Sequence, residues 1–141
     1  MAISIQIVEK NKNIQKVINL GDTGLNKQVV THHNDDEVVA LNYAAQQQPR
    51  IILLNYEITG SDSFDYIIFL LNKSPDSKII VIGNSLSQEQ ILNCLLAGAN
   101  GYLEQQSVET FLNKAIVSVL NNEVWISRKM TATLLERLRS L

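Results

Sequence analysis

The segment RIILLNYEITG, residues 50–60, joins an apolar run to a polar residue and a turn. Its apolar residues at 51–54 are typical of a strand that is covered on both faces of a sheet. Asn55 follows at the point where such a strand leaves the sheet, and the Thr-Gly pair at 59–60 indicates a turn. The segment therefore predicts a buried strand with an amide side chain at its carboxyl end.

Apolar runs of this kind alternate with helical patterns along the chain. The runs predict strands at residues 3–8, 28–31, 51–54, 78–82 and 102–103. Apolar residues at helical spacing predict helices within residues 14–20, 38–45, 64–71, 87–96 and 107–120. Strands and helices that alternate with short links predict an α/β fold, with a doubly wound, five-stranded parallel sheet and right-handed crossovers.

Several polar residues precede these helices and are predicted to cap them. Asp35 or Asp36 precedes the helix within 38–45, and Ser107 precedes the helix that ends near residue 120. Ser87 and Gln90 have the spacing of a capping box. We therefore expect these residues to bind the free backbone N–H groups at the helix starts.

The carboxyl ends of the strands in a parallel sheet meet at one edge, where ligands bind. The residues predicted at this edge are Glu9, Lys10, Asn55, Gly83, Asn84, Glu104 and Gln105. We therefore expect a functional site, if the sheet carries one, among these side chains.

Composition narrows the class of protein. The chain has 141 residues, 45% of them hydrophobic and 18% charged, and a net charge of −2, which predicts one globular domain and gives no basic footprint for nucleic acid. Its one cysteine, Cys94, excludes an internal disulfide and a multi-cysteine metal site. The start of the chain does not resemble a signal peptide, and no apolar run approaches the ~20 residues of a membrane span. We expect a cytoplasmic protein with no membrane contact.

Other polar and aromatic residues have plainer interpretations. His32 and His33 invite a metal-site interpretation, but adjacent histidines in a strand point to opposite faces, which favours a loop in which an Asp caps the next helix. Cys94 is interpreted as a small packing residue in preference to a redox sensor. Half-buried cover is favoured over a ligand pocket for Tyr43, Tyr56 and Tyr66.

Four segments resemble the receiver domains of response regulators, specifically the NarL/LuxR type. They are IILLNYEITG, KIIVIGNS, LLAGANGYLEQ and LNNEVWIS. The resemblance implies a flavodoxin-like receiver fold with strand order 2-1-3-4-5, a receiver-like domain over residues 1–122 and an extra linker helix over residues 123–141. In that family the linker helix leads to a helix-turn-helix DNA-binding domain, which is absent from this chain.

Receiver domains of this family use five groups at the strand ends. Two acids and an Asp nucleophile hold Mg²⁺, and a hydroxyl and a lysine bind the phosphoryl oxygens. Apart from these five, an aromatic residue on the last strand takes part in the switch. The resemblance implies that the acidic pair has become Glu9 and Lys10, and the phosphoacceptor Asn55. The switch hydroxyl, the switch aromatic and the lysine correspond to Gly83, Tyr102 and Gln105. We therefore expect a degenerate site with no catalytic residue, no metal and no cofactor.

Lys10 beside Glu9 suggests a further hypothesis. In this hypothesis the ammonium group of Lys10 lies near Glu9 and Asn55 and takes the place of the missing metal cation. The alternative is a lysine in open solvent, because lysine heads prefer water.

The C-terminal segment SRKMTATLLERLRSL predicts an amphipathic helix. Its apolar stripe consists of Met130, Leu134, Leu138 and Leu141. The basic residues on its polar face suggest DNA or membrane contact, but a helix docked on its own domain or on a second copy is favoured.

The resemblance, with the degenerate site, implies a phosphorylation-independent receiver domain, a pseudo-receiver, that acts in signalling and transcription regulation. It is expected to form a homodimer and to contact other regulatory proteins through the helices at 87–96 and 107–120 and the C-terminal helix, and to reach DNA only through a helix-turn-helix domain outside this chain. The alternative is a sensor of a small molecule, bound at the crevice of Glu9, Lys10, Asn55, Asn84 and Gln105. An enzyme is disfavoured, since the sequence shows no nucleophile–base pair, glycine-rich phosphate loop or metal cluster.

Overall fold

The computed structural model describes residues 2–18 and 28–141. Within these residues the strands are β1 (Ile3–Val8), β2 (Val29–Asn34), β3 (Ile51–Asn55), β4 (Lys78–Gly83) and β5 (Gly101–Glu104). The α-helices are α1 (Glu37–Gln47), α2 (Ser63–Lys73), α3 (Gln88–Ala97), α4 (Val108–Leu120) and α5 (Arg128–Arg139). Short 3-10 turns, η2 (Tyr56–Ile58), η3 (Gly60–Asp62) and η4 (Gln105–Ser107), follow β3 and β5.

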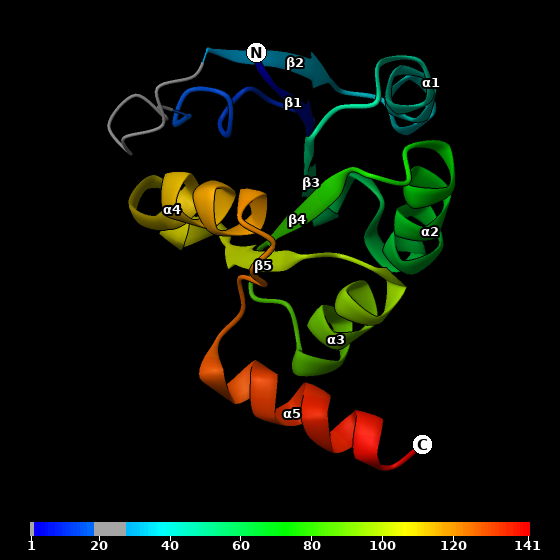
Figure 1. Cartoon of the computed structure of the whole chain (residues 1–141), viewed down its shortest axis with the longest axis vertical. Helices are drawn as coiled ribbons and strands as arrows, with labels where there is room; N and C mark the ends of the chain where they lie inside the picture. The colour runs from blue at the N-terminus through cyan, green and yellow to red at the C-terminus, as the bar shows by residue number, and fades with distance from the viewer. Residues whose placement is uncertain (1, 19–27) are drawn as a thin grey trace.

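The strands form one parallel sheet in the order β2-β1-β3-β4-β5. Helix α4 covers one face of the sheet, and α1, α2 and α3 cover the other (Figure 1). The predicted fold class and strand order are therefore confirmed. Among the helices in the described part of the chain, none is long and apolar enough to cross a bilayer.

Strand β3 shows why the sheet needs helices on both faces. Ile51 and Leu53 pack in the core on the α4 side, whereas Ile52 and Leu54 pack in the core on the side of α1 to α3. All four side chains are fully buried. Burying one such side chain stabilises the fold by roughly 1.5–3 kcal/mol, so neither face can be left to solvent.

The segment that was predicted as a helix within residues 14–20 is not helical in its described part. Residues 13–17 form a turn. Leu20 and the predicted turn at 21–24 fall within residues 19–27, which lie outside the described part of the chain. Ile14 is fully buried in the α4-side core, and Val17 packs against that core. The apolar spacing thus reflects packing against the sheet and not a helical repeat.

The predicted caps are confirmed for two helices. The carboxylate of Asp36 accepts hydrogen bonds from the first turn of α1, and Ser87 and Gln90 form a capping box at α3. Ser107 precedes α4 as predicted, but its side chain makes no cap hydrogen bond, because residues 105–107 form η4 and bring Ser107 into a helical backbone conformation.

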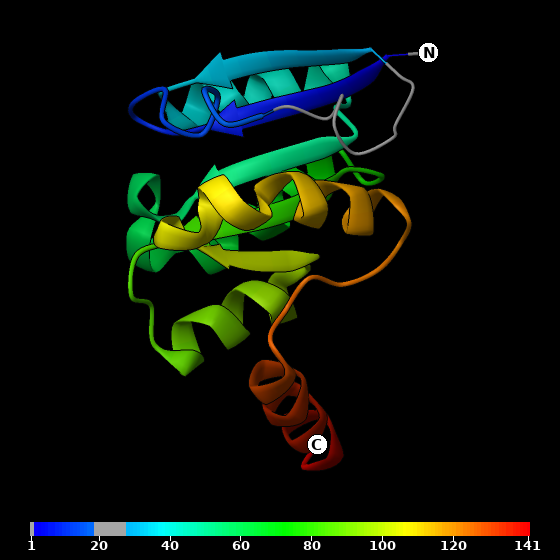
Figure 2. The ribbon, with the colours of Figure 1, turned by 90° about the vertical axis from the view of Figure 1, so that its left-hand side faces the viewer.

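The segment after α4 pairs with the edge of β5. The N–H of Trp125 donates to the carbonyl of Asn100 at 3.0 Å, and the N–H of Tyr102 donates to the carbonyl of Trp125 at 2.9 Å. This close approach favours glycine at position 101, since a Cβ there would lie 3.1 Å from both the Cβ and the carbonyl oxygen of Trp125, which is tighter than most Cβ contacts. Helix α5 then begins and lies at the end of the molecule beyond β5 and α3 (Figures 1 and 2).

Replacing Gly101 should therefore detach this segment. We expect Gly101→Val to lower the free energy of unfolding by about 1–3 kcal/mol, the usual effect of overpacking, and to shift the fluorescence of Trp125, the one tryptophan of the chain, to longer wavelength. Urea unfolding and fluorescence spectra measure both effects. Val124→Ala, at an exposed position in the same segment, is the control and should change neither; a Gly101→Val protein with unchanged stability and spectrum would contradict the prediction.

Candidate functional site

The strand ends that were expected to carry the site lie along one edge of the sheet. The pairing register sets Val8 beside Leu54, Asn55 beside Ile82, and Gly83 beside Glu104. The residues that follow these positions therefore emerge at the same edge. Their side chains nevertheless make contacts of different kinds.

The side chain of Glu9 binds the turn that follows β1. Its residue is fully buried, and its two carboxylate oxygens accept from the N–H of Ile14 at 3.2 and 3.0 Å. Burial raises the pKa of Glu9, and this effect outweighs the backbone hydrogen bond from Ile14 and the electrostatic interaction with His33, which lower it. The carboxylate thus holds local backbone instead of facing a ligand.

Lys10 does not take the place that was suggested for it. Its side chain is exposed, and among the described residues it forms no hydrogen bond or ion pair with Glu9 or Asn55. The hypothesis of an internal ammonium in the role of a metal ion is therefore wrong. The ammonium stays hydrated because Glu9 is buried and already bonded to Ile14.

Asn55 ends β3 and caps the short turn that follows. Its side-chain oxygen accepts from the N–H of Glu57 at 3.0 Å, at the start of η2. This contact explains why a side chain with an oxygen acceptor stands at this position. An aspartate oxygen would accept the same bond, so the turn does not by itself require the neutral amide.

The space around Gly83 is filled by two neighbouring side chains. A Cβ at this position would lie 2.6 Å from Cδ1 of Leu86 and 2.9 Å from the hydroxyl oxygen of Tyr102. Such distances are shorter than real Cβ contacts, so position 83 has no room for a hydroxyl residue in this arrangement.

Glu104 fixes the position of Tyr102. The Tyr102 hydroxyl donates to Oε2 of Glu104 at 2.6 Å, while Oε1 of the same carboxylate accepts from the N–H of Ser85. Burial, followed by the hydrogen bond and the negative charge of Glu104, raises the pKa of Tyr102 well above its usual value. The hydroxyl therefore stays protonated and remains a donor. Sequence reasoning named Glu104 only as a strand end; its alternation with Tyr102 along β5 was the available signal.

Gln105 faces a different part of the surface. It lines a cavity of about 370 Å³ together with residues from the turn after β1 and from α4, including Asn13, Lys16 and Glu109. Glu9, Lys10, Asn55 and Asn84 do not line this cavity. The five residues of the suggested ligand crevice therefore do not share it.

The two histidines point apart, as predicted, but both lie in β2, which extends to Asn34, and not in the loop that was favoured. The ring of His32 stacks on the ring of Tyr43 with centroids 4.0 Å apart, whereas Nε2 of His33 lies 2.9 Å from the carbonyl oxygen of Asn11. Within residues 2–18 and 28–141, no three His, Cys, Asp or Glu side chains are grouped so that they could hold a metal ion.

Cys94 and Tyr66 are core residues. Cys94 is buried, and burial raises the pKa of its thiol to about 11, so the thiolate is scarce near neutral pH. The Tyr66 hydroxyl donates to the carbonyl of Glu37 at 2.7 Å and links α2 to α1. The interpretation of Cys94 as a packing residue is confirmed.

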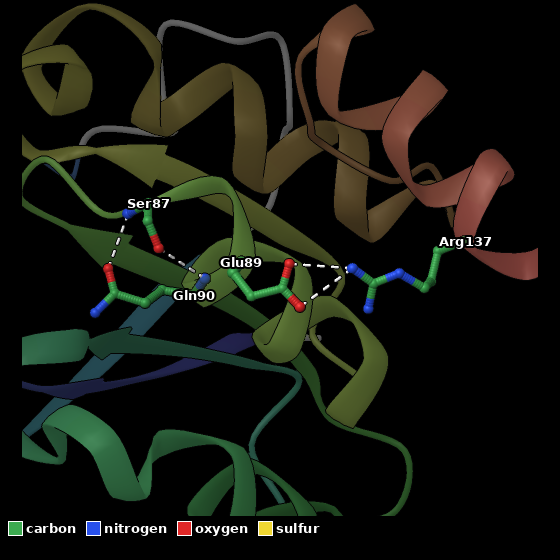
Figure 3. A network of polar contacts seen from close by, with 4 residues as sticks. All are labelled: Ser87, Glu89, Gln90 and Arg137. Atoms are coloured by element: carbon green, nitrogen blue, oxygen red, sulfur yellow. Dashed lines mark hydrogen bonds and ion pairs between the residues drawn. The ribbon is translucent and has the colours of Figure 1, made fainter.

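Helix α5 is attached to α3 by few contacts. Nη2 of Arg137 lies 3.1 and 3.0 Å from the two carboxylate oxygens of Glu89, in the first turn of α3 beside the capping box (Figure 3). Because the two side chains are 42% and 62% exposed, such a pair contributes only about 0–1 kcal/mol. Met130 is buried, but Leu138 and Leu141 of the predicted apolar stripe are exposed. Only the first half of the stripe is docked.

The buried carboxyl group of Glu9 leads to a prediction about pH. Since its pKa is above the ordinary value of 4.5 in the folded chain, the folded state binds the proton more tightly, and stability falls as the pH rises through the raised pKa. Glu9→Gln removes this charge and keeps an oxygen for the Ile14 N–H. We expect the variant to be more stable than the parent at pH 7 and to lose less stability between pH 4.5 and pH 7, measured by urea unfolding at both pH values.

Glu123→Gln, at an exposed position, is the control and should follow the parent at both pH values. If Glu9→Gln is less stable than the parent at pH 7 while the control is unchanged, the charged carboxylate stabilises the turn and the sign of the prediction is wrong.

No protein-family model matches the chain. The nitrate/nitrite response regulator protein homolog of Haemophilus influenzae is 29% identical over 119 residues, which cover 79% of this chain and 57% of that protein. The nitrate/nitrite response regulator protein NarL of Escherichia coli K12 is 28% identical over 100 residues, which cover 71% of this chain and 46% of that protein. The chain thus spans about half the length of these curated relatives.

Solved structures share the fold over nearly the whole chain. A LuxR-family two-component response regulator from Aurantimonas sp. SI85-9A1 has a TM-score of 0.77 at 17% identity, with 97% of this chain and 98% of that chain covered. The isolated REC domain of RcsB from Salmonella enterica serovar Typhimurium, in the apo form, has a TM-score of 0.77 at 17% identity, with 95% and 98% covered. The chain is a homologue of the NarL/LuxR-type response regulators, and its fold is that of receiver domains.

Proposed function

We propose that the chain is an atypical receiver domain that regulates signalling and transcription without being phosphorylated. The observation that carries the proposal is the chemistry at the carboxyl edge of the sheet. The strand ends that should supply the acidic pair and the nucleophile carry Glu9, Lys10 and Asn55, and Glu9 is buried against the Ile14 backbone. These positions are interpreted as a degenerate phosphorylation site.

Phosphoryl transfer on such a site needs a divalent cation and a nucleophilic carboxylate. Mg²⁺ requires oxygen ligands in near-octahedral geometry, usually with carboxylates among them. Here the ammonium of Lys10 adds positive charge at the edge, and the amide of Asn55 cannot form an acyl phosphate. The residues present therefore do not fit a magnesium ion.

The surroundings of Gly83 support independence from phosphorylation. The switch of the family begins with movement of a hydroxyl side chain, and Gly83 has no side chain to move. The Tyr102 hydroxyl and Leu86 occupy the space where such a side chain would lie. Glu104 holds Tyr102 in place through the 2.6 Å hydrogen bond. We propose that this arrangement is the working state of the domain, with its position set by contacts within the chain.

The surfaces of α3, α4 and α5 are proposed to bind partners, including a second copy of the chain. Leu96 on α3, Phe111 on α4 and the exposed leucines of α5 are available there. We further propose that residues 123–141 form a linker beyond a receiver-like domain of residues 1–122, that DNA contact belongs to a helix-turn-helix domain outside this chain, and that the protein works in the cytoplasm without a cofactor.

The alternative function, a sensor with its ligand at the crevice of the strand ends, remains a prediction. Gln105 lines a cavity, but Glu9, Lys10, Asn55 and Asn84 do not line that cavity. No contact among the described residues favours this crevice over other surfaces as a ligand site.

Phosphorylation is tested directly by mass spectrometry. After incubation with acetyl phosphate and Mg²⁺, we expect the intact chain to show no gain of a phosphoryl group, because the edge lacks a nucleophile and a metal site. The double variant Lys10→Asp with Asn55→Asp restores two carboxylates and is the matched comparison. A phosphoryl adduct on the parent chain that is lost in Glu9→Gln would overturn the proposal.

Dimer formation is tested by light scattering over a range of concentrations. We expect a dimer, and we expect Leu138→Glu to weaken its association by about tenfold or more, because a charge on the exposed apolar stripe of α5 has to be desolvated. Val38→Glu introduces the same charge at an exposed position on α1 and should leave the association unchanged. A chain that stays monomeric at high concentration would contradict the proposal.

A further inference from the structure

A cavity of about 510 Å³ lies where β5, α3, α4 and the start of α5 meet. It is distinct from the cavity that Gln105 lines. Its volume is within the range of roughly 300–1,000 Å³ that is usual for sites that bind small molecules. Its wall combines residues of α3, β5, α4 and the start of α5, so the folded domain is needed to form it.

The lining combines aromatic side chains with one carboxylate. Tyr102 comes from β5, Phe111 from α4 and Trp125 from the segment before α5. The rings of Phe111 and Trp125 are tilted by 43° with centroids 6.2 Å apart. Met130 and Ile91 add apolar surface.

Among the described residues that line the cavity, Glu104 has the only charged side chain. One of its oxygens accepts from the Tyr102 hydroxyl and the other from the Ser85 N–H. A carboxylate oxygen can accept more than one hydrogen bond, so Glu104 retains both acceptor capacity and negative charge. The described part of the lining therefore combines aromatic rings with a single negative group.

We propose that this cavity binds a small organic cation, an aromatic or alkyl amine, with its apolar body against Phe111, Trp125 and Met130 and its ammonium group toward Glu104. The faces of aromatic rings attract cations, and a carboxylate of the cavity adds charge and hydrogen bonding. Nζ of Lys114 already lies 5.8 Å from the centroid of the Phe111 ring, so the ammonium group of the ligand is directed to Glu104 and not to Phe111. An anionic molecule of the same shape is repelled by Glu104.

A ligand in this cavity would contact residues that fix two regions, the start of α5 and the surroundings of Tyr102. Met130 and Trp125 fix the start of α5, and Glu104 positions the Tyr102 hydroxyl beside Gly83. A ligand that binds two arrangements of these residues with different affinity shifts the balance between them. The binding site itself does not depend on whether the domain is phosphorylated.

Trp125 provides the measurement, because it is the one tryptophan of the chain and lines the cavity. Phenethylamine, phenethyl alcohol and phenylacetate serve as probes, since they share a benzene ring and carry a cationic, a neutral and an anionic group at neutral pH. We expect a saturable change of Trp125 fluorescence with phenethylamine, with at least about tenfold weaker binding of phenylacetate and intermediate binding of the alcohol.

Three variants locate the site. Glu104→Gln should weaken the binding of phenethylamine by about tenfold, so that it binds no more tightly than phenethyl alcohol. Glu109→Gln removes a charge outside the cavity and should leave the affinities for both probes unchanged. Ser107→Phe fills the cavity and should abolish the response to all three probes. Ser107 makes no cap hydrogen bond, so this replacement removes none at the start of α4, and circular dichroism checks that each variant is folded.

Several results would overturn the proposal. They are a flat fluorescence response to phenethylamine, equal binding of the amine and phenylacetate, or an unchanged response in Ser107→Phe. A change of Trp125 fluorescence that depends on protein concentration and not on the probes would assign the cavity to a second copy of the chain, and would also overturn it.

Discussion

A parallel sheet has two apolar faces, and both have to be covered by other parts of the chain. In this chain the central strand β3 makes that requirement strict. Residues 51–54 are fully buried, with neighbouring side chains in different cores. Helices α1, α2 and α3 cover one face of the sheet (Figure 1). Helix α4 and the turn that contains Ile14 cover the other. This requirement fixes the winding of the chain and brings the strand ends to a common edge.

At that edge, the polar side chains are bound mainly to the chain itself. Glu9 accepts from Ile14, Asn55 accepts from Glu57, and Glu104 accepts from Tyr102. Each contact stabilises a local turn or a neighbouring side chain, and those of Glu9 and Asn55 leave fewer oxygens for a metal ion at the ends of β1 and β3. Three aromatic side chains, Tyr102, Phe111 and Trp125, instead line the cavity between β5, α4 and the start of α5.

The sequence predicted the parts of the fold that depend on burial. Continuous apolar runs such as residues 51–54 identify the strands, and the short links between them identify the parallel winding. The same signal was misleading at Ile14, whose burial comes from packing beneath the sheet edge and not from a helix. Spacing alone does not distinguish these two origins of an apolar pattern.

The candidate site was only partly predictable. The identities of the residues at the strand ends were read from the sequence, but the direction of each side chain depends on contacts across the fold. Lys10 turned out exposed because its expected partner is buried, and Gly83 is constrained by Leu86 and Tyr102, which approach from other elements. Such contacts leave no pattern in the sequence around the residue itself.

The pairing of Trp125 with β5 has a consequence for assembly. An unpaired strand at the border of a sheet is a template on which a foreign strand can add. Here the N–H of Tyr102 and the carbonyl of Asn100 are already bonded to the chain's own Trp125. Growth of the sheet by strand addition at this border would first require release of that segment, which guards the domain against polymerisation from the β5 side.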